Sequence, residues 1–493
     1  MIDWKQLRRG LVRHSAQIGL FAVIVITISR AASVMRYPIA VGIDGYYYVL
    51  QITSFATHHH FYFPTKTPLT LFFLIAINTL TRDPVWTIKI GSTMLLVMLS
   101  LGVFAMVTSV TRNIWPGLLG SALLIIPQSH FYMTTEYLNQ LGAIVLLMWA
   151  GWSAVRAAQR RRRIDWVIVA ALLVTSFLSH RSALILAAAI AFCVLLVTAL
   201  NRGVKYRILA LLATLILWLG PAIISVQPFF TVPDWLQKQI SIRPHWPVEQ
   251  LLVAEELMLA LSSLMVFGFV VWQAKQRKLT TLSFVFGSIA LFSLLVTLNP
   301  FLSADAMLSS VAGRLRVLAF IQVALLLSSL IFLAYTTRRA AALYLAGIFL
   351  PLLILSAVAP APRGVRQEFL VRRAALIDGL KSHLNELGSK PMIIAPHGDQ
   401  FVITATTGVP SQQRPPVVSQ YDRVYWLLND VENQTLTGSS IGLFRNHATD
   451  TLLVEDSTFK RHWLTMSPFD KSRLLRTNPN LNTIQALLEM KVN

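Results

Sequence analysis

The feature that most constrains this chain is a series of apolar runs, separated by short basic segments, that fills most of its first 360 residues. A helix needs about 17 to 25 apolar residues to cross a bilayer. Because lipid offers the backbone no hydrogen-bond partners, such runs cross as helices. Two shorter runs, over residues 69–80 and 114–127, are ambiguous by length. Runs of sufficient length begin near Ile18, Val85, Leu138, Val167, Ser182, Ile208, Leu251, Leu279, Leu315 and Ala340.

Composition agrees with a chain that folds mainly in lipid. Apolar residues make up 55% and charged residues 13% of the 493 positions, whereas soluble proteins carry about 25% charged residues. A net charge of +21 would suggest a nucleic-acid partner in a soluble protein. Here the basic residues lie in short clusters between apolar runs, as in cytoplasmic loops, so nucleic acid is excluded as a partner. The single cysteine, Cys193, lies inside an apolar run and offers neither a disulfide nor a thiolate metal site.

The basic clusters predict the orientation of the chain. Cytoplasmic loops are enriched in Lys and Arg. The basic N-terminus, followed by the apolar residues 18–34, is interpreted as an uncleaved first helix with a cytoplasmic N-terminus. The same rule predicts cytoplasmic positions for residues 160–163, 202–207, 275–278 and 338–339.

Parity decides between the two ambiguous runs. Five apolar candidates precede the cluster at residues 160–163, and an even number of crossings is required, so one of them does not span. The run over residues 69–80 follows two prolines, is short and ends at Asp83-Pro84, so we assign it to a juxtamembrane helix on the external side. A polytopic α-helical membrane protein of about eleven spans is expected. We expect it in a bacterial inner membrane, with residues after 360 external.

The residues after 359 mix helical and strand patterns. Residues 392–395, 424–428 and 451–454 read as strands, and residues 367–387, 459–475 and 483–490 read as helices. A linker containing Pro360, Pro362 and Gly364 precedes them. The sequence therefore predicts a transmembrane domain over residues 1–359 and a small external α/β domain over residues 360–493.

Three predicted external loops each carry a charged or titratable group. The first places Asp44 after Gly42 and before three tyrosines, and the third places His180 and Arg181 at a helix end. The second carries Glu136 and Asn139, which share a helix face if the next helix has begun. Ionisable groups next to lipid are costly and indicate function. Further external cations are Lys238, Arg243, Arg314 and Arg316, with His245 beside them.

The order of these residues resembles the GT-C superfamily of membrane glycosyltransferases, which includes aminoarabinose transferases, protein mannosyltransferases and oligosaccharyltransferase catalytic subunits. An acid followed by tyrosines (Asp44, Tyr46 to Tyr48) comes soon after the first helix. A Lys-x-Pro-Leu turn (Lys66 to Leu69) leads into the juxtamembrane run. A second acid, Glu136, and a later basic residue, Arg181, complete the pattern across the membrane part of the chain.

The resemblance implies transfer of a sugar from a polyprenyl-phosphate or polyprenyl-diphosphate carrier to a lipid, glycan or protein acceptor on the external face. It suggests Asp44 as a general base that inverts the anomeric centre, with Glu136 as a second catalytic acid. A departing phosphate needs nearby positive charge, for which Arg181, Lys66, Arg243 and Arg314 are candidates. Substrate-binding candidates are His180, Tyr46, Asn139 and His58. No cofactor is assigned, and a divalent metal ion stays open.

Structural roles compete for several of these residues. Asp44 fits the N-cap of a helix, and the adjacent tyrosines fit an interfacial aromatic belt. Glu136 fits a carboxylate that complements a helix N-terminus. The histidines at 58–60 are interpreted as a solvated loop rather than a metal site, because consecutive side chains diverge. In the tail, His397 and Asp399 follow a predicted strand and fit a turn with a helix cap, or a contact with the acceptor.

Two other functions remain open from the sequence. A transporter or lipid-carrier flippase would place titratable groups near mid-membrane in Gly- or Pro-broken helices, whereas here they gather at helix ends. A non-catalytic envelope-assembly protein would bind through its tail and would not need Asp44.

Overall fold

The computed structural model describes residues 4–226, 250–299, 318–337, 339–359, 366–396, 398–412, 421–429, 444–446 and 451–478. The chain forms two compact units. The first, which we call the helical unit, comprises residues Met1–Ser33, Lys66–Thr70 and Gly91–Pro362. The second, which we call the mixed unit, comprises residues Val34–Thr65, Leu71–Ile90 and Arg363–Asn493. The mixed unit therefore joins segments that lie far apart in the sequence.

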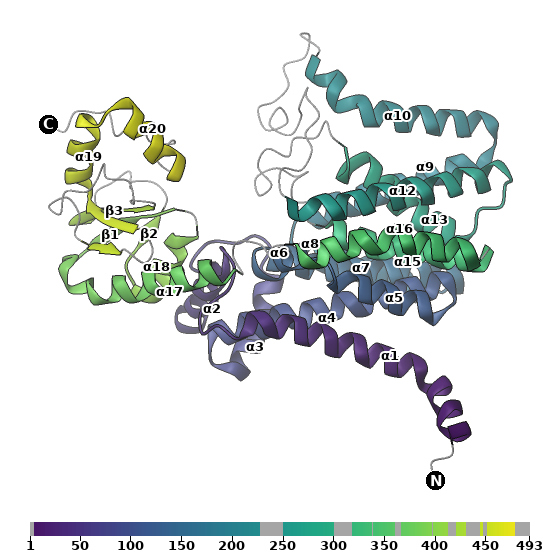
Figure 1. Ribbon diagram of the computed structural model, residues 1–493, viewed down its shortest axis with the longest axis horizontal. Coiled ribbons are helices and arrows are strands. Elements are labelled where there is room, and N and C mark those ends of the chain that lie inside the picture. Colours follow the sequence, from purple (N-terminus) through teal and green to yellow (C-terminus); the bar gives the residue numbers. More distant parts are fainter. Residues whose placement is uncertain are drawn as a thin grey trace. The chain divides into compact units, whose positions relative to one another are not determined.

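Antiparallel helices build the helical unit, and they lie side by side in Figure 1. α7 packs along α8, α5 along α15, and α12 along α13, α15 and α16. The helices are α1 (Trp4–Met35), α4 (Pro84–Thr111), α5 (Ile114–Ile125), α6 (His130–Thr135), α7 (Leu138–Arg160), α8 (Arg163–Ser179), α9 (Ser182–Arg202), α10 (Val204–Val226), α12 (Gln250–Lys275), α13 (Thr281–Phe292) with a π-helical turn over Ser293–Thr297, α15 (Ala319–Thr337) and α16 (Arg339–Val358).

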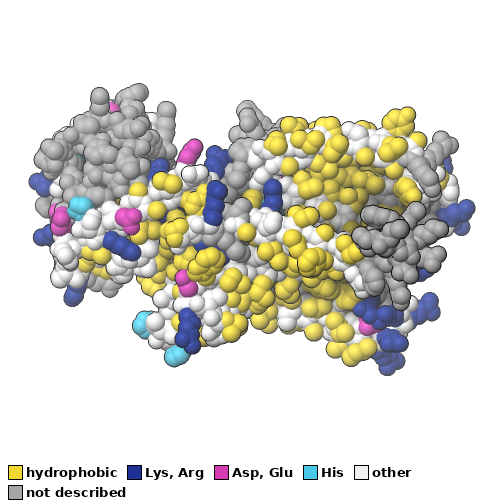
Figure 2. Space-filling model, turned by 60° about the horizontal axis from the view of Figure 1, so that its bottom comes forward, with side chains coloured by type: hydrophobic (Ala, Val, Ile, Leu, Met, Phe, Trp, Pro, Cys, Tyr) yellow, Lys and Arg dark blue, Asp and Glu magenta, His cyan; other side chains and the backbone are white. Residues whose placement is uncertain are grey.

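The surface of the helical unit is suited to lipid. Large apolar side chains such as Phe21, Leu195 and Leu343 are 68%, 67% and 74% exposed, and Figure 2 shows hydrophobic side chains covering broad areas of the helices. Six helices are long and apolar enough to cross a membrane within the described residues: α4, α7, α9, α12, α15 and α16. An integral membrane protein is thereby supported, and the count of about eleven crossings stays a prediction.

A helix is present at both ambiguous positions. α3 (Leu69–Thr81) has 13 residues and α5 has 12. At about 1.5 Å per residue, each is shorter than the hydrocarbon core of a bilayer. The choice between them therefore still rests on the parity of the basic clusters.

Contacts between helix ends show which ends of α10, α12 and α16 lie together. Arg207, in the first turn of α10, donates a hydrogen bond to the carbonyl of Ala274 near the end of α12, at 3.0 Å. Arg207 belongs to one basic segment that was predicted to be cytoplasmic, and Ala274 directly precedes another. At the other end of α12, the Ser356 hydroxyl in the last turn of α16 donates to Glu255 at 3.0 Å. α12 and α16 are therefore antiparallel, with their basic ends on the same side of the bundle.

The mixed unit contains a five-stranded sheet of strand order β2-β1-β3-β5-β4. β1 pairs parallel with β2 and β3, and β5 pairs antiparallel with β3 and β4. Helices pack against the sheet, and the first part of the chain adds α2 (Gly45–His58) and α3 to this unit. The remaining elements are β1 (Pro391–Ile394), β2 (Ser411–Gln412), β3 (Arg423–Asn429), β4 (Phe444–Asn446), β5 (Thr451–Glu455), α17 (Gln367–Ser382), the 3-10 turn Leu384–Glu386, α18 (Asp399–Thr407), α19 (Asp456–Thr465) and α20 (Pro468–Thr477).

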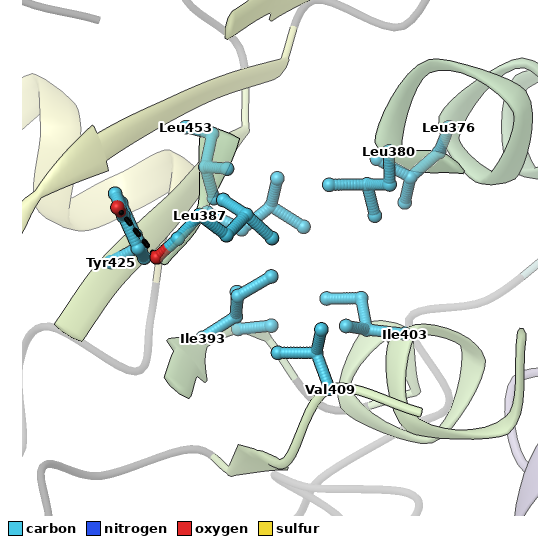
Figure 3. Close-up of a cluster of buried hydrophobic side chains, with 10 residues drawn as sticks. Leu376, Leu380, Leu387, Ile393, Ile403, Val409, Tyr425 and Leu453 are labelled. Atoms are coloured by element: carbon cyan, nitrogen blue, oxygen red, sulfur yellow. Dashed lines mark hydrogen bonds between the residues drawn. The ribbon is translucent and has the colours of Figure 1, made fainter. Parts of the chain in front are cut away.

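The sheet has an apolar core on each face. On one face, α17 and α18 contribute Leu376, Leu380 and Ile403 to a cluster with Ile393 of β1 (Figure 3). On the other, Trp426 of β3 packs with side chains of α19, including Phe459 and Trp463. Burial of these side chains, at roughly 25 cal/mol per Å² of apolar surface, is the main source of the domain's stability.

The expected α/β tail is confirmed in its main elements and wrong in some boundaries. The three predicted strands are β1, β3 and β5. The predicted helix over 459–475 is two helices, because Pro468 begins α20 behind a Ser467 N-cap. Strands β2 and β4 were not predicted. The helix start expected near Asp399 is the start of α18, although its N-cap is Gly398. The helix predicted over 483–490 lies outside the described residues. The domain boundary proposed at residue 360 stays a prediction.

Candidate functional site

Asp44 stands at the N-cap of α2, directly after a turn in which Gly42 has φ of 91°. The N-cap position was one predicted role. The Asp44 carbonyl accepts the first helical hydrogen bond, from Tyr47 N at 3.0 Å, but the side chain makes no capping hydrogen bond. The carboxylate is thus partly buried at a helix start without serving the usual capping function.

The tyrosines after Asp44 belong to the core of the mixed unit. Tyr46 and Tyr48 are each 4% exposed, so the interpretation of these two as an interfacial belt is wrong. Burial raises the pKa of Tyr46 above its usual value, although the nearby Arg373 opposes the shift. Tyr46 is therefore a buried residue of the first turn of α2, with Arg373 Cζ 5.8 Å from its ring centroid.

Gln51 holds the loop that follows α2 in place by hydrogen bonds. Its side chain is fully buried and forms two hydrogen bonds with the backbone of Phe63, at 3.0 and 2.9 Å. It also donates to the Tyr47 hydroxyl at 3.0 Å. Tyr47 stacks on Phe63 with ring centroids 5.7 Å apart. Phe401 of α18 packs edge-on against Tyr47 at 5.5 Å, so the C-terminal part of the chain contacts this loop directly.

Arg373 of α17 is a residue that the sequence did not reveal. It is 2% exposed and donates hydrogen bonds to the carbonyl oxygens of Gly42 and Ile43, the second at 3.3 Å. These two carbonyls directly precede Asp44 in the chain. No side-chain pattern marks an arginine whose partners are backbone oxygens, and only the fold brings them together.

His58 and Lys66 are exposed. His58 ends α2 and its ring stacks on His60 at 5.7 Å. Among the described residues, no three His, Cys, Asp or Glu side chains gather as a metal site. Lys66 belongs to the helical unit, whereas Asp44, Tyr46 and His58 belong to the mixed unit.

The second acidic loop lies in the helical unit. Glu136 is 5% exposed and stands at the C-cap of α6, with the Thr135 hydroxyl 3.5 Å from its carboxylate. α7 begins only at Leu138, so Glu136 does not share a helix face with Asn139. Asn139 Oδ1 is buried and finds no hydrogen-bond partner among the described residues.

His180 and Arg181 form the turn between α8 and α9. His180 Nδ1 lies 2.6 Å from the Ser182 hydroxyl. Arg181 is exposed at the N-cap of α9. The other phosphate-binding candidates, Arg243 and Arg314, and also Lys238, His245, Arg316 and His397, lie outside the described residues.

The sequence analysis did not identify two adjacent buried glutamates at one end of the helical unit. Glu255 is fully buried and Glu256 is 7% exposed at the start of α12. Glu255 accepts from Ser356, and Gln128 donates to the carbonyl of Ala357 in α16 at 2.7 Å. Two adjacent glutamates within an apolar run were the signal that could have found them.

His130 lies in the loop that leads from α5 to α7. Its side chain is 1% exposed, and its Nδ1 donates to the Pro127 carbonyl at 2.5 Å. Burial lowers the pKa of His130 to about 4. His130 is therefore neutral near pH 7, and its Nε2 has no hydrogen-bond partner among the described residues.

The helical unit also contains a cavity of about 360 Å³. Its lining is almost entirely apolar and comes from α4, α7, α8, α9, α13 and α15. Gln322 and Ser288 are the polar side chains in the lining. A cavity of this chemistry fits a hydrocarbon chain.

Several solved structures share the fold of this chain, and those of one archaeal enzyme are among them. The chain matches the apo crystal structure of the Archaeoglobus fulgidus oligosaccharyltransferase with a TM-score of 0.51 and 11% identity, over 80% of this chain and 64% of that one. It matches AglB, the oligosaccharyltransferase of the same organism, in complex with an inhibitory peptide and a dolichol-phosphate, with a TM-score of 0.50 and 12% identity, over the same shares.

This likeness is one of fold, and it agrees with the fold that the resemblance to GT-C enzymes predicted. The chain spans somewhat less than two thirds of the length of the archaeal enzyme. No protein-family model matches the sequence. No curated protein matches it by sequence.

Proposed function

We propose that this protein is a membrane glycosyltransferase that moves a sugar from a polyprenyl-phosphate or polyprenyl-diphosphate carrier to an acceptor on the external face. The observation that carries the proposal is the partly buried carboxylate of Asp44, held at a helix start in a GT-C fold and not used for capping. A carboxylate at such a position can act as a general base.

In the proposed reaction, the acceptor hydroxyl oxygen bonds to the anomeric carbon while the bond from that carbon to the phosphate oxygen breaks. The hydroxyl proton passes to the Asp44 carboxylate. One displacement with one base inverts the anomeric centre. The negative charge of the departing phosphate needs cations near it, which Arg181, Lys66, Arg243 and Arg314 supply in this proposal. Arginine binds phosphate oxygens through two parallel N–H donors.

The remaining candidates have supporting roles in this proposal. Glu136 acts as the second acid of the site, and His180, Asn139 and His58 contact the substrates. Tyr46 acts from beneath the Asp44 loop, because it is buried.

The apolar cavity supports a lipid-linked donor. Its volume of about 360 Å³ accommodates several isoprene units, and its lining comes from membrane helices. A dolichol-phosphate is bound in the AglB complex. We assign the cavity to the hydrocarbon tail of the donor, which reaches it from the bilayer. The proposed setting is a bacterial inner membrane, with the N-terminus cytoplasmic and the C-terminal part external.

The test uses purified protein in detergent with a polyprenyl-phosphate sugar and extracts of envelope glycans or lipids as acceptors. Wild type is compared with Asp44→Asn and with the control Asp378→Asn, which removes an exposed carboxylate from α17. Transfer is expected for wild type and the control and is expected to fall by a factor of about 10² to 10⁴ for Asp44→Asn. Equal transfer by all three proteins would defeat the assignment of the base.

A further inference from the structure

We infer that Arg373 is a positioning residue for Asp44, and that the C-terminal α/β domain thereby completes the site of the membrane enzyme. The inference rests on the proposed role of Asp44 as the base. It adds that the geometry of the base is set by a residue that lies 331 positions after Gly42 in the chain.

The hydrogen bonds of Arg373 are directed at the turn before the base. Nη1 donates to the Gly42 carbonyl and Nη2 to the Ile43 carbonyl, the latter at 3.3 Å. A guanidinium is planar, so two donors on one plane fix both the distance and the tilt of the two peptide groups. Because Asp44 is the next residue, its Cα position follows from these two carbonyls.

Burial makes this contact strong. Arg373 is 2% exposed, and a buried cation is costly unless its donors are satisfied. Two aromatic rings flank the guanidinium: Phe369 at 4.5 Å and Tyr46 at 5.8 Å from Cζ to ring centroid. Cation–π attraction to both rings adds to the hydrogen bonds. Tyr46 belongs to the first turn of α2, so Arg373 contacts the chain on both sides of Asp44.

Gly398 brings the α/β domain even closer to the same turn. A Cβ on Gly398 would lie 2.6 Å from Ile43 Cγ2 and 3.1 Å from the Ile43 carbonyl oxygen. Gly398 also has φ of 90°, which favours glycine. The close backbone approach requires the absence of a side chain at this position.

The contact between Gly398 and Ile43 lies just after the carboxyl end of a β-strand. Residue 398 follows β1, which has parallel neighbours on both sides. In α/β sheets the carboxyl end of such a strand is where ligands usually bind. In this chain the turn before Asp44 lies against that end of β1, through the contact between Gly398 and Ile43. We conclude that the sheet edge at which α/β domains usually bind ligands contacts a loop of the same chain here.

Helix α18 extends the contact along α2. Phe401, 7% exposed, packs on both Tyr47 and Phe63 at centroid distances of 5.5 and 5.7 Å. Gln51 holds Phe63 to α2 from the other side. The Asp44 turn is therefore fixed by α17 through Arg373 and by α18 through Gly398 and Phe401.

The experiment is a double-mutant cycle on the transfer assay with the full-length protein. Arg373→Met is expected to lower kcat about 10²-fold, the cost of a misplacement near 1 Å, with a smaller change in the KM of the lipid donor. Arg373→Lys is expected to recover part of kcat, because an ammonium replaces one of the two hydrogen bonds. Arg372→Met, which removes the neighbouring cation on α17, is the matched control and is expected to retain activity.

A second pair of variants tests the glycine contact. Gly398→Ala and Gly408→Ala both place a side chain at a positive φ, of 90° and 74°. An added Cβ meets Ile43 at position 398, whereas no atom lies within 4 Å at position 408. If the Asp44 turn is held as inferred, Gly398→Ala lowers kcat much more than Gly408→Ala. Equal losses would show only backbone strain and would contradict the inference.

The cycle separates this inference from the proposed function. If Arg373 acts through Asp44, the double variant Asp44→Asn, Arg373→Met retains the same residual rate as Asp44→Asn alone. Additive losses would mean that Arg373 acts independently of Asp44 and would overturn the inference. A third outcome is that Asp44→Asn loses activity while Arg373→Met keeps the wild-type kcat. This result would overturn the inference about Arg373 and would leave Asp44 as the proposed base. Limited trypsin digestion of each variant reports whether the α/β domain remains folded.

Discussion

The Ser356 hydroxyl donates a hydrogen bond to the carboxylate of Glu255 at 3.0 Å, and this bond joins the last turn of α16 to the start of α12. Both residues are fully buried. A carboxyl group at such a position is costly unless hydrogen-bonded. The bond therefore contributes to the pairing of two helices whose sequences are about a hundred positions apart.

Replacement of either partner is expected to destabilise the helical unit. Glu255→Ala leaves the Ser356 hydroxyl without its acceptor, and Ser356→Ala leaves the carboxyl without its donor. Each change should cost about 1–3 kcal/mol, the penalty for an unsatisfied buried group. Thermal unfolding in detergent should show a lower midpoint for both, and an unchanged midpoint for Glu368→Ala, which removes an exposed carboxylate from α17. A wild-type midpoint of thermal unfolding in both Glu255→Ala and Ser356→Ala would contradict this expectation.

Stability is expected to fall in acid because of His130. Its folded-state pKa is lowered to about 4 by burial, whereas the unfolded pKa is about 6.5. Between these values the unfolded chain binds the proton more readily, so stability is fully present above pH 6.5 and is lost as the pH falls toward 4. The loss is about 3 kcal/mol from this group. His130→Gln should flatten the pH dependence of the free energy of unfolding between these two pKa values. An unchanged slope would contradict the assignment of this loss of stability to His130.

The assignment of the apolar cavity predicts a chain-length effect. Ala187 lines the cavity, and its neighbour Ala188 in α9 does not. Ala187→Phe should raise the KM for a long polyprenyl-phosphate donor while affecting a short, water-soluble analogue less. Ala188 is exposed, so Ala188→Phe should leave both KM values unchanged. An equal effect of the two substitutions, or none at position 187, would argue against a donor in this cavity.

Single-cysteine labelling checks the predicted orientation. Cys193→Ala gives a background without thiols, since the chain has one cysteine. A membrane-impermeant maleimide added to intact cells should modify cysteine at Lys381, in the C-terminal domain, and should modify cysteine at Arg162 only after permeabilisation. Labelling of position 162 from outside would reverse the topology and with it the proposed external site.

The sequence predicted most of the membrane helices because composition alone determines them. Each apolar run became a helix, and the basic ends of α10 and α12 do lie together through Arg207 and Ala274. Lengths were harder to predict. α3 and α5 have similar apolar character and similar short lengths, so no local feature distinguishes their relation to the membrane.

Candidate site residues could be proposed from the sequence only where they stand in loops with a recognisable order. Asp44 and its tyrosines were proposed in this way, although the burial of Tyr46 was not predicted. Arg373 could not be found, since its partners are carbonyl groups that every residue carries. The adjacent residues Glu255 and Glu256 were visible in the sequence, but they belong to helix α12 and not to a predicted external loop.

The bond from Arg373 to Gly42 spans 331 positions of the chain. During synthesis, the turn that carries Asp44 emerges early, and α17 emerges only after the membrane helices have been made. Under the proposed role of Asp44, the base lacks the hydrogen bonds of Arg373 through most of translation. The proposal therefore predicts that a chain ending before α17 is inactive, and that the order of synthesis delays activity until the C-terminal domain has folded.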